Sequence, residues 1–281
     1  MRAASKTPKK QAADVLVFEA GLAETIEAAR ALIMTGHVIA EGDRGQMRRV
    51  EKPGDRLDPR SSFRLAHQQA HTGRFVSRGG LKLEHALRAF DLDVTAKTAI
   101  DVGIGSGGFT DCLLQREAAW VYGVDVGYGQ VAWRIRNDPR VVLLERTNLR
   151  HLDAAMLLSA AEASAARSGR PPAGAPTFAV IDVSFISLTT VVAAITVQLP
   201  SITEMVALIK PQFECPREAL EGGVVTGPEP RRAAIDRVHG TADDQGWARH
   251  GLVESPILGR DGNVEYLTWL HRAAPDGEAV P

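Results

Sequence analysis

Short apolar runs alternate with segments of helical periodicity from Lys97 onward. Short continuous apolar runs predict buried β-strands, and apolar residues that recur roughly every three to four positions predict amphipathic helices. Strands are expected at 98–102, 120–125, 141–144, 177–182, 205–210, 250–256 and 264–270, and helices at 108–116, 128–136, 187–198 and 229–244. This order predicts an α/β fold with a doubly wound, Rossmann-like, mostly parallel sheet that binds ligands at the carboxyl ends of its strands.

The N-terminal part of the chain has shorter elements. Helical periodicity over 14–36 breaks at Gly21, and a short apolar strand follows at 38–40. Two short helices with small strands predict a compact α+β domain over 12–58. Few apolar residues follow, which predicts a linker over 59–76.

A second domain is expected over 77–272. It opens with a helix over 77–90, whose apolar residues form one stripe and leave Lys82 outside it. Residues 154–176 are rich in alanine and then in proline and glycine. This composition predicts a helical insertion followed by a flexible loop.

Composition narrows the cellular context. Of 281 residues, 44% are hydrophobic, which is enough for a packed core. No apolar run approaches the roughly 20 residues of a membrane span, and no apolar stretch of a signal peptide follows the basic start. Cys112 and Cys215 are the only cysteines, which favours reduced thiols and no cysteine-rich metal site. The expectation is a cytoplasmic protein without a membrane partner or a metal.

The net charge of −1 hides an uneven distribution. Residues 1–90 carry a net charge of +6, and the remaining residues carry −7. A basic N-terminal third fits contact with a nucleic acid, although an ordinary solvated surface explains the same count.

The stretch Ala99-Ile-Asp-Val-Gly-Ile-Gly-Ser-Gly-Gly-Phe-Thr-Asp111 reads as a buried strand, a glycine-rich turn and the start of a helix. Such a turn lets the backbone approach a nucleotide-like ligand without Cβ clashes. Gly103, Gly105 and Gly108 have the spacing of a dinucleotide site. Asp101 at the strand tip, however, suits the cationic amino-acid end of S-adenosylmethionine better than a pyrophosphate. The favoured interpretation is a methyl-donor site, with a nicotinamide site as the alternative.

Two polar residues follow the neighbouring strands. Asp125 comes 24 residues after Asp101, near the offset at which an acidic side chain binds ribose hydroxyls in nucleotide-binding folds. A helix N-cap is the alternative role for Asp125. Asn148 suits either an adenine edge or a turn.

Three ionisable residues are expected at one edge of the sheet. Asp182 ends the fourth strand, Lys210 ends the fifth, and Glu265 lies at the start of a late strand. Each of them alone fits a surface or capping role. Three such residues beside a glycine loop indicate a catalytic site.

Eight motifs together resemble the TlyA family, described as ribosomal RNA 2′-O-methyltransferases and often named hemolysins. They are Ser77-Arg-Gly-Gly-Leu-Lys82, the Asp101–Asp111 loop, Tyr122-Gly-Val-Asp-Val-Gly-Tyr-Gly-Gln130, Glu145-Arg-Thr-Asn148, Ile181-Asp-Val-Ser-Phe-Ile-Ser187, Lys210-Pro-Gln-Phe-Glu214, Gly222-Gly-Val-Val225 and Gly262-Asn-Val-Glu265. The resemblance covers nearly the whole chain. It implies an FtsJ-like methyltransferase domain, S-adenosyl-L-methionine as cofactor, ribosomal RNA or ribosomal subunits as partner, and a cytidine as the expected target.

FtsJ-type enzymes use a Lys-Asp-Lys-Glu tetrad, which the resemblance places at Lys82, Asp182, Lys210 and Glu265. A ribose 2′-hydroxyl must lose its proton as it attacks the methyl group, and lysine in water is too basic to take that proton. A second ammonium group nearby and partial loss of water both favour the neutral amine. Lys210 is therefore the expected base or hydroxyl-orienting group, Lys82 tunes it, and the two carboxylates position the lysines.

The resemblance also implies two sets of binding residues. Donor contacts are expected from Asp101, Gly103, Gly105, Ser106, Gly107, Gly108, Phe109, Asp125, Val126, Asn148 and Asp182. RNA contacts are expected from Arg44, Arg48, Arg49, Arg74 and Arg78. The last two lie on a predicted basic helix, for which a domain hinge is the alternative reading.

Residues 12–58 resemble the S-four type (alpha-L) RNA-binding module of the family, with departures. An Arg-Leu-Asp opening is Ala12-Ala13-Asp14 here, and a Ser-Arg pair is Thr25-Ile26. Two lost arginines mean fewer phosphate contacts, and each contact contributes to salt-dependent affinity. The module is expected to bind RNA weakly or to rely on the three arginines between 44 and 49.

Other classes of function stay open at this point. A non-catalytic RNA-binding or ribosome-assembly protein on the same fold would be marked by a broken tetrad, and the four residue types are intact. A membrane-active hemolysin would need a span, a signal peptide or a long cationic amphipathic helix, none of which the sequence shows. Competition between NAD and the methyl donor would separate a methyltransferase from a nicotinamide oxidoreductase.

Overall fold

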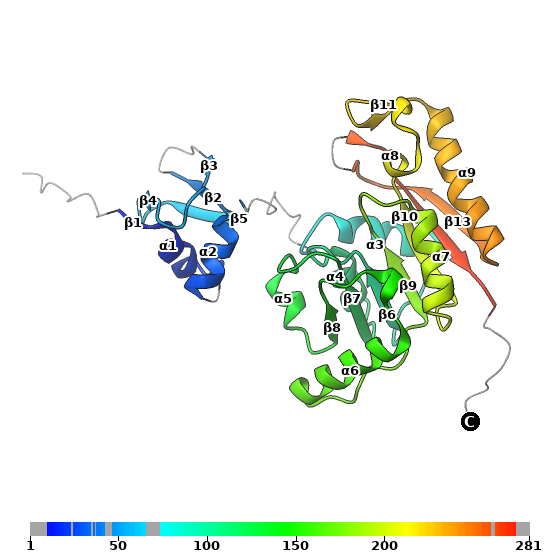
Figure 1. Cartoon of the computed structure of the whole chain (residues 1–281), viewed down its shortest axis with the longest axis horizontal. Helices are drawn as coiled ribbons and strands as arrows, with labels where there is room; N and C mark the ends of the chain where they lie inside the picture. Colours follow the sequence, from blue (N-terminus) through cyan, green and yellow to red (C-terminus); the bar gives the residue numbers. More distant parts are fainter. Residues whose placement is uncertain are drawn as a thin grey trace, which may run out of the picture. The chain divides into compact units, whose positions relative to one another are not determined.

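The computed structural model of the protein describes residues 10–23, 25–34, 36, 38–42, 47–65, 74–259 and 262–273. The chain divides into two compact units, residues 1–71 and 72–281, each of which is described by itself (Figure 1).

The N-terminal unit packs two helices against small antiparallel sheets. Its elements are β1 (Gln11–Ala12), α1 (Ala13–Glu19), α2 (Ile26–Met34), β2 (Val38–Glu41), β3 (Met47–Arg49), β4 (Arg56–Leu57) and β5 (Ser62–Leu65). One sheet has the order β3-β2-β5, and β1 pairs with β4. Leu16, Val17, Ile33 and Val38 are among the buried residues of its core.

The linker predicted over 59–76 is wrong in part, because β5 lies inside it. Strand β5 pairs with β2 in antiparallel register, with Phe63 opposite Ala40. The side chain of Phe63 packs against the core of the unit. Ser62 to Leu65 alternates polar and apolar residues, as a half-buried strand does, but four residues are too short a signal to separate a strand from a polar connection. Residues 66–73 of the predicted linker lie outside the described part of the chain.

The larger unit is a three-layer α/β structure. Its strands are β6 (Thr98–Val102), β7 (Trp120–Val124), β8 (Val141–Leu144), β9 (Phe178–Ile181), β10 (Glu204–Ile209), β11 (Leu220–Glu221), β12 (Val224–Val225), β13 (Ala248–Glu254) and β14 (Tyr266–His271). Its helices are α3 (Gly79–Ala89), α4 (Gly108–Gln115), α5 (Trp133–Arg136), α6 (Ala154–Ser168), α7 (Leu188–Gln198), α8 (Pro211–Glu214) and α9 (Pro228–Asp244), with short 3-10 turns at Leu149–His151 and Arg217–Ala219.

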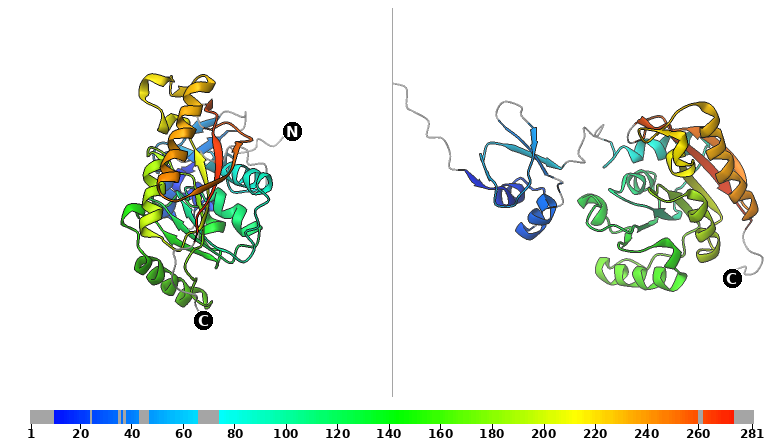
Figure 2. Two further views of the ribbon diagram at one scale, coloured as in Figure 1. Left: turned by 90° about the vertical axis from the view of Figure 1, so that its right-hand side faces the viewer. Right: turned by 45° about the horizontal axis from the view of Figure 1, so that its top comes forward.

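A seven-stranded sheet with the order β13-β14-β10-β9-β6-β7-β8 forms the middle layer. Helices α3, α4 and α5 cover one face, and α6, α7 and α9 cover the other (Figures 1 and 2). Alternate residues of a strand enter opposite cores, as Ala99 and Ile100 do in β6. The doubly wound α/β fold predicted from the apolar runs is therefore confirmed.

The direction of β14 decides where the site forms. β14 is antiparallel to both of its neighbours, whereas the other strands of the sheet share one direction. The strand order reverses between β6 and β9, the type of position at which open α/β sheets bind ligands. Since β14 runs backward, its first residues lie at the edge where the parallel strands end.

Two segments differ from the predicted elements. The helix expected at 128–136 is reduced to α5, because Gly129 has a φ of +73° and its N–H donates to the side chain of Glu145 at 2.7 Å. The loop after α6 is anchored, because the hydroxyl of Tyr122 donates to the carbonyls of Ala173 and Gly174 at 3.1 Å each. Among the described helices, none is both long and apolar enough to cross a membrane.

Arg272 fastens the loop after α7 to the end of β14. Its guanidinium donates to four backbone carbonyls of the 196–202 segment at 2.8–3.4 Å and lies 4.5 Å from the ring centre of Trp247. Burial lowers the pKa of Arg272. A lysine ammonium cannot reproduce the planar arrangement of donors with which the guanidinium reaches several carbonyls at once. We expect Arg272→Lys to lower the free energy of unfolding by about 1–3 kcal/mol, measured by urea unfolding.

The matched control for this prediction is Arg249→Lys. Arg249 forms an exposed ion pair with Asp243 at 3.2 Å, and exposed pairs contribute less than about 1 kcal/mol. Equal effects of the two substitutions would contradict a specific role of Arg272.

Candidate active site

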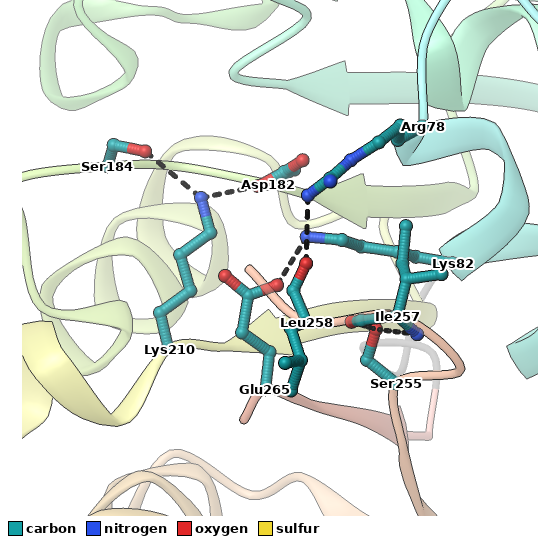
Figure 3. A network of polar contacts seen from close by, with 9 residues as sticks. All are labelled: Arg78, Lys82, Asp182, Ser184, Lys210, Ser255, Ile257, Leu258 and Glu265. Atoms are coloured by element: carbon teal, nitrogen blue, oxygen red, sulfur yellow. Dashed lines mark hydrogen bonds and ion pairs between the residues drawn. The ribbon is translucent and has the colours of Figure 1, made fainter. Parts of the chain in front are cut away.

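Four ionisable side chains lie close together at the carboxyl edge of the sheet (Figure 3). Lys82 comes from α3, Asp182 follows β9, Lys210 follows β10 and Glu265 precedes β14. They form two ion pairs: Lys210 Nζ lies 2.6 Å from Asp182 Oδ1, and Lys82 Nζ contacts Glu265 Oε2. The side chains of Lys82 and Glu265 are only 9% and 3% exposed, and those of Lys210 and Asp182 are 11% and 24% exposed. The Lys210–Asp182 pair is therefore the one that a substrate reaches more easily.

The ammonium group of Lys210 has a second partner. It donates to the hydroxyl of Ser184 at 3.0 Å and lies 6.0 Å from the ring centre of Phe213. The next residue after Ser184, Phe185, is 88% exposed, and its ring centre lies 5.4 Å from that of Phe213. A cation held between a carboxylate and a hydroxyl can orient, or exchange a proton with, a hydroxyl group that enters beside it.

Asp101 is fully buried at the tip of β6, and only one of its two carboxylate oxygens accepts hydrogen bonds from described residues. Its Oδ2 accepts hydrogen bonds from the backbone N–H and the hydroxyl of Thr110 at 3.0 and 2.7 Å. Its Oδ1 has no hydrogen-bond partner in the part of the chain that the structure describes. Burial raises the pKa of Asp101 to about 7; the hydrogen bond from Thr110 opposes the rise, and the carboxylate of Asp182 adds to it. A buried carboxylate without a counter-charge suits a ligand that carries an ammonium group.

Gly103 brings the glycine loop against the catalytic edge. Its φ is +84°, and a Cβ at this position would lie 2.5 Å from the carbonyl oxygen of Asp182. A larger residue would push the loop away from the end of β9. Gly107 is the N-cap of α4 and makes no side-chain hydrogen bond there. The loop over Ser106 to Gly108 is therefore left without a side-chain cap at the start of the helix.

Asp125 supports this loop from the tip of β7. Its Oδ2 accepts from the N–H of Gly105 at 2.8 Å, and its Oδ1 accepts from the N–H of Gly127 at 2.7 Å. A carboxylate has further acceptor capacity, so Asp125 can still bind ribose hydroxyls. Val126 beside it is exposed.

Two further predicted donor residues have structural contacts. Asn148 Oδ1 accepts from the N–H of Arg150 at 3.0 Å, which is the turn-type role and the N-cap of a 3-10 helix. Phe109 belongs to α4, and its ring is buried in the core against α3. Asp101 and Asp125 are the two carboxylates at this loop that could hold a cofactor, through the free Oδ1 of Asp101 and the remaining acceptor capacity of Asp125.

The five predicted RNA-binding arginines lie in different settings. Arg48 and Arg49 are exposed on β3, and Arg44 lies outside the described residues. Arg74 forms an ion pair with Glu84 at 2.5 Å, and Arg78 donates to the carbonyl of Leu258 at 2.8 Å. Arg74 and Arg78 therefore have contacts within their own unit.

The predicted basic helix at 74–80 is wrong over its first residues, because α3 begins at Gly79. Phe75 is buried in the core, and the N–H of Val76 donates to Asp111 Oδ2 at 2.6 Å. These two anchors hold the segment in an irregular conformation.

Sequence reasoning gave no role to three buried polar residues of the motifs. Asp111 holds the segment before α3, and Glu214 accepts from the Ser187 hydroxyl and the Leu188 N–H at 2.6 Å each, capping α7. The third is Asn263. A polar residue inside an otherwise apolar or glycine-rich motif is the signal that was available for each.

Within the described residues, no group of three or more His, Cys, Asp or Glu side chains could hold a metal ion.

Comparisons with known proteins agree with this geometry. The model of the FtsJ-like methyltransferase family matches residues 75–272. The chain is 37% identical over 258 residues to the 16S/23S rRNA (cytidine-2′-O)-methyltransferase TlyA of Mycobacterium tuberculosis, covering 92% of this chain and 88% of that protein. It is 41% identical over 278 residues to Bacillus subtilis YqxC, named as a candidate rRNA methyltransferase, covering 98% and 91%. A solved structure of a hemolysin-named protein from Streptococcus thermophilus matches with a TM-score of 0.65 and 37% identity, covering 98% and 92%.

Proposed function

Because the chain belongs to the FtsJ-like methyltransferase family as a TlyA-type homologue, we propose that it methylates a ribose 2′-hydroxyl of ribosomal RNA, with a cytidine as the target. The observation that carries the proposal is the pair of ion pairs, Lys210–Asp182 and Lys82–Glu265, directly beside the glycine loop.

The glycine loop is the proposed donor site. When bound, S-adenosylmethionine supplies an electrophilic methyl group, whose bond to sulfur breaks as the bond to the ribose oxygen forms. Asp101 would bind the ammonium group through its free Oδ1, and Asp125 would bind the ribose hydroxyls. Gly103 keeps this loop in contact with the end of β9, next to Asp182.

As the neutral amine, Lys210 is the proposed acceptor of the hydroxyl proton; as the ammonium, it is the group that orients the hydroxyl by donating a hydrogen bond to it. Asp182 and Ser184 hold Nζ in place, so the amine loses little freedom when a substrate arrives. The deeper pair, Lys82–Glu265, would keep a second cation fixed nearby without exposing it to solvent. This division of roles follows from the difference in exposure between the two pairs.

RNA binding is proposed for two regions. The exposed ring of Phe185 lies beside Ser184 and offers a flat surface on which an unpaired base can stack. In the N-terminal unit, Arg48 and Arg49 on β3 are exposed cations suited to phosphates, which supports residues 12–58 as an S-four-like RNA-binding module.

The test is methylation of unmodified ribosomal subunits by the purified protein with labelled S-adenosylmethionine. Ribose methylation is mapped by resistance of the RNA to alkaline cleavage. We expect a 2′-O-methyl cytidine, and we expect excess NAD not to displace the donor in calorimetry. If the protein binds the donor but leaves no 2′-O-methyl group on the RNA of either subunit, ribosomal RNA is not its substrate.

A further inference from the structure

A buried side chain, Asn263, ties the segment that carries Glu265 to the β11–β12 hairpin. Asn263 is only 1% exposed. Its Oδ1 accepts from the N–H of Val225 at 3.0 Å, and its Nδ2 donates to the carbonyl of Gly223 at 2.9 Å. The hairpin itself consists of two residue pairs, and so short a ladder has little stability of its own. Asn263 therefore helps to fix the hairpin's position, together with Arg231, whose Nε donates to the Val225 carbonyl at 3.3 Å.

The same segment is fastened around Glu265. The N–H of Gly259 donates to the carbonyl of Asn263, and the N–H of Ser255 donates to the carbonyl of Glu265, both at 2.8 Å. Arg78, at the start of the helix that carries Lys82, donates to the carbonyl of Leu258 (Figure 3). The loop before Glu265 is thus held from the hairpin on one side and from α3 on the other.

Gly259 lies directly against the carboxylate of Glu265. A Cβ at this position would overlap Oε1 and lie 2.6 Å from Cδ. The other oxygen, Oε2, contacts Lys82. The carboxylate is therefore confined between the loop backbone and the lysine.

We infer that Asn263 is a positioning residue for the reaction: it locks the hairpin to the Glu265 segment and so fixes the Glu265 carboxylate against Lys82. The inference rests on the proposed function, because it gives that pair a task in methyl transfer. Asparagine suits this role since its amide offers an acceptor and a donor at once, and the two backbone groups of the hairpin require both.

The first test is Asn263→Asp, which keeps the shape and the acceptor for Val225 but replaces the donor to Gly223. We expect kcat for subunit methylation to fall about 10–100-fold at pH 8, because small misplacements of a catalytic group have effects of this size. The KM for the subunit and the Kd of S-adenosylmethionine, measured by calorimetry, should change less than about threefold, or under 1 kcal/mol. The rate relative to wild type should recover as the pH falls and the new carboxyl group gains the missing proton.

Gly259→Ala tests the same idea from the opposite side without touching the hairpin. Its methyl group would displace the Glu265 carboxylate, and we expect a similar loss of kcat with donor binding retained. Gly240→Ala on α9 is the matched control, because a Cβ there meets nothing within 4 Å. Gly240→Ala should leave kcat unchanged. Should Asn263→Asp fail to fold, Gly259→Ala still tests the placement of Glu265.

Amide hydrogen exchange supplies a readout that does not depend on methylation. Coupling predicts faster exchange in Asn263→Asp at Ser255, whose N–H is bonded to the Glu265 carbonyl. Unchanged exchange at Ser255, or full kcat in both folded variants, would overturn the inference. If either variant lost donor binding and thermal stability together, the inference would also be overturned, because that result would show a structural role only. A wild-type protein that methylates no ribosomal RNA would contradict the proposed function alone.

Discussion

Replacing Lys210 with alanine should lower the rate of methyl transfer by about 10²–10⁴-fold, the usual contribution of a proton-transfer group. The reason is the position of Nζ, which Asp182 and Ser184 hold at 2.6 and 3.0 Å in the more accessible of the two ion pairs. The Kd of S-adenosylmethionine should change less than about threefold, because the donor loop makes its contacts through other residues. Single-turnover methylation of ribosomal subunits and calorimetry with the donor measure the two quantities.

Lys210→Arg separates the two roles that Nζ can have. Arginine keeps a positive charge and hydrogen-bond donors, but it does not lose a proton in proteins. We expect the arginine variant to be as inactive as the alanine variant, which would identify Lys210 as the proton acceptor. Substantial activity would instead show that a fixed cation orienting the hydroxyl is sufficient.

Lys97→Ala is the matched control for both variants. Lys97 also forms an ion pair, with Glu204 at 2.5 Å, at the other end of the sheet from Lys210. Its loss should leave the rate within about threefold of wild type. An equal loss of rate and donor binding in Lys210→Ala would identify that lysine as a donor-binding or folding residue.

The layered fold was predictable because its five neighbouring parallel strands, β6 to β10, are buried on both faces. Continuous apolar runs such as Val141–Leu144 and Phe178–Ile181 occur in few other settings, and each of them became a strand of the sheet. The failures were short or polar elements. Strand β5 has four residues, and the segment before α5 contains a glycine at positive φ, so neither carries enough pattern to fix its structure.

The four residue types that meet at the candidate active site were also predictable, but their pairing was not. Asp182 and Lys210 end neighbouring strands, and their contact follows from the parallel order of β9 and β10. Glu265 reaches Lys82 only because β14 inserts antiparallel between β10 and β13, and no local sequence pattern specifies that insertion. Lys82 lies off the apolar stripe of α3, and Glu265 nonetheless holds it in a buried position.

The residues that were hardest to identify are those whose side chains form hydrogen bonds to backbone groups. Asp111, Glu214 and Asn263 satisfy N–H or carbonyl groups of loops far away in the sequence. Arg78 was predicted to contact RNA from its charge, and the bond from its guanidinium to a loop carbonyl was not foreseen. Charge and spacing do not reveal such partners, because the partners are main-chain groups that every residue carries.

Asp101→Asn should make the ligand-free protein more stable at pH 8 and at the same time weaken donor binding. The folded pKa of about 7 lies above the usual value of 3.8, so the folded protein keeps a proton that the unfolded chain has already lost. The stability contributed by the protonated group is complete below about pH 4 and is lost as the pH rises toward 7. At about 1.4 kcal/mol for each pH unit, the loss amounts to up to about 4 kcal/mol. Asparagine does not titrate, so its unfolding free energy should lack this slope between pH 4 and 8.

Donor binding should show the opposite dependence on pH. Only the ionised form of Asp101 can pair with an ammonium group, so the affinity of the wild-type protein for S-adenosylmethionine should rise as the pH increases through about 7. Asp101→Asn should bind the donor about 10–10²-fold more weakly at pH 8, since a buried charge-assisted hydrogen bond contributes about 1.5–3 kcal/mol. Urea unfolding and calorimetry from pH 5 to 8 measure both effects, with the exposed Asp236→Asn on α9 as control. Higher stability with unchanged donor affinity would mean that the free oxygen of Asp101 faces no ammonium group of the donor.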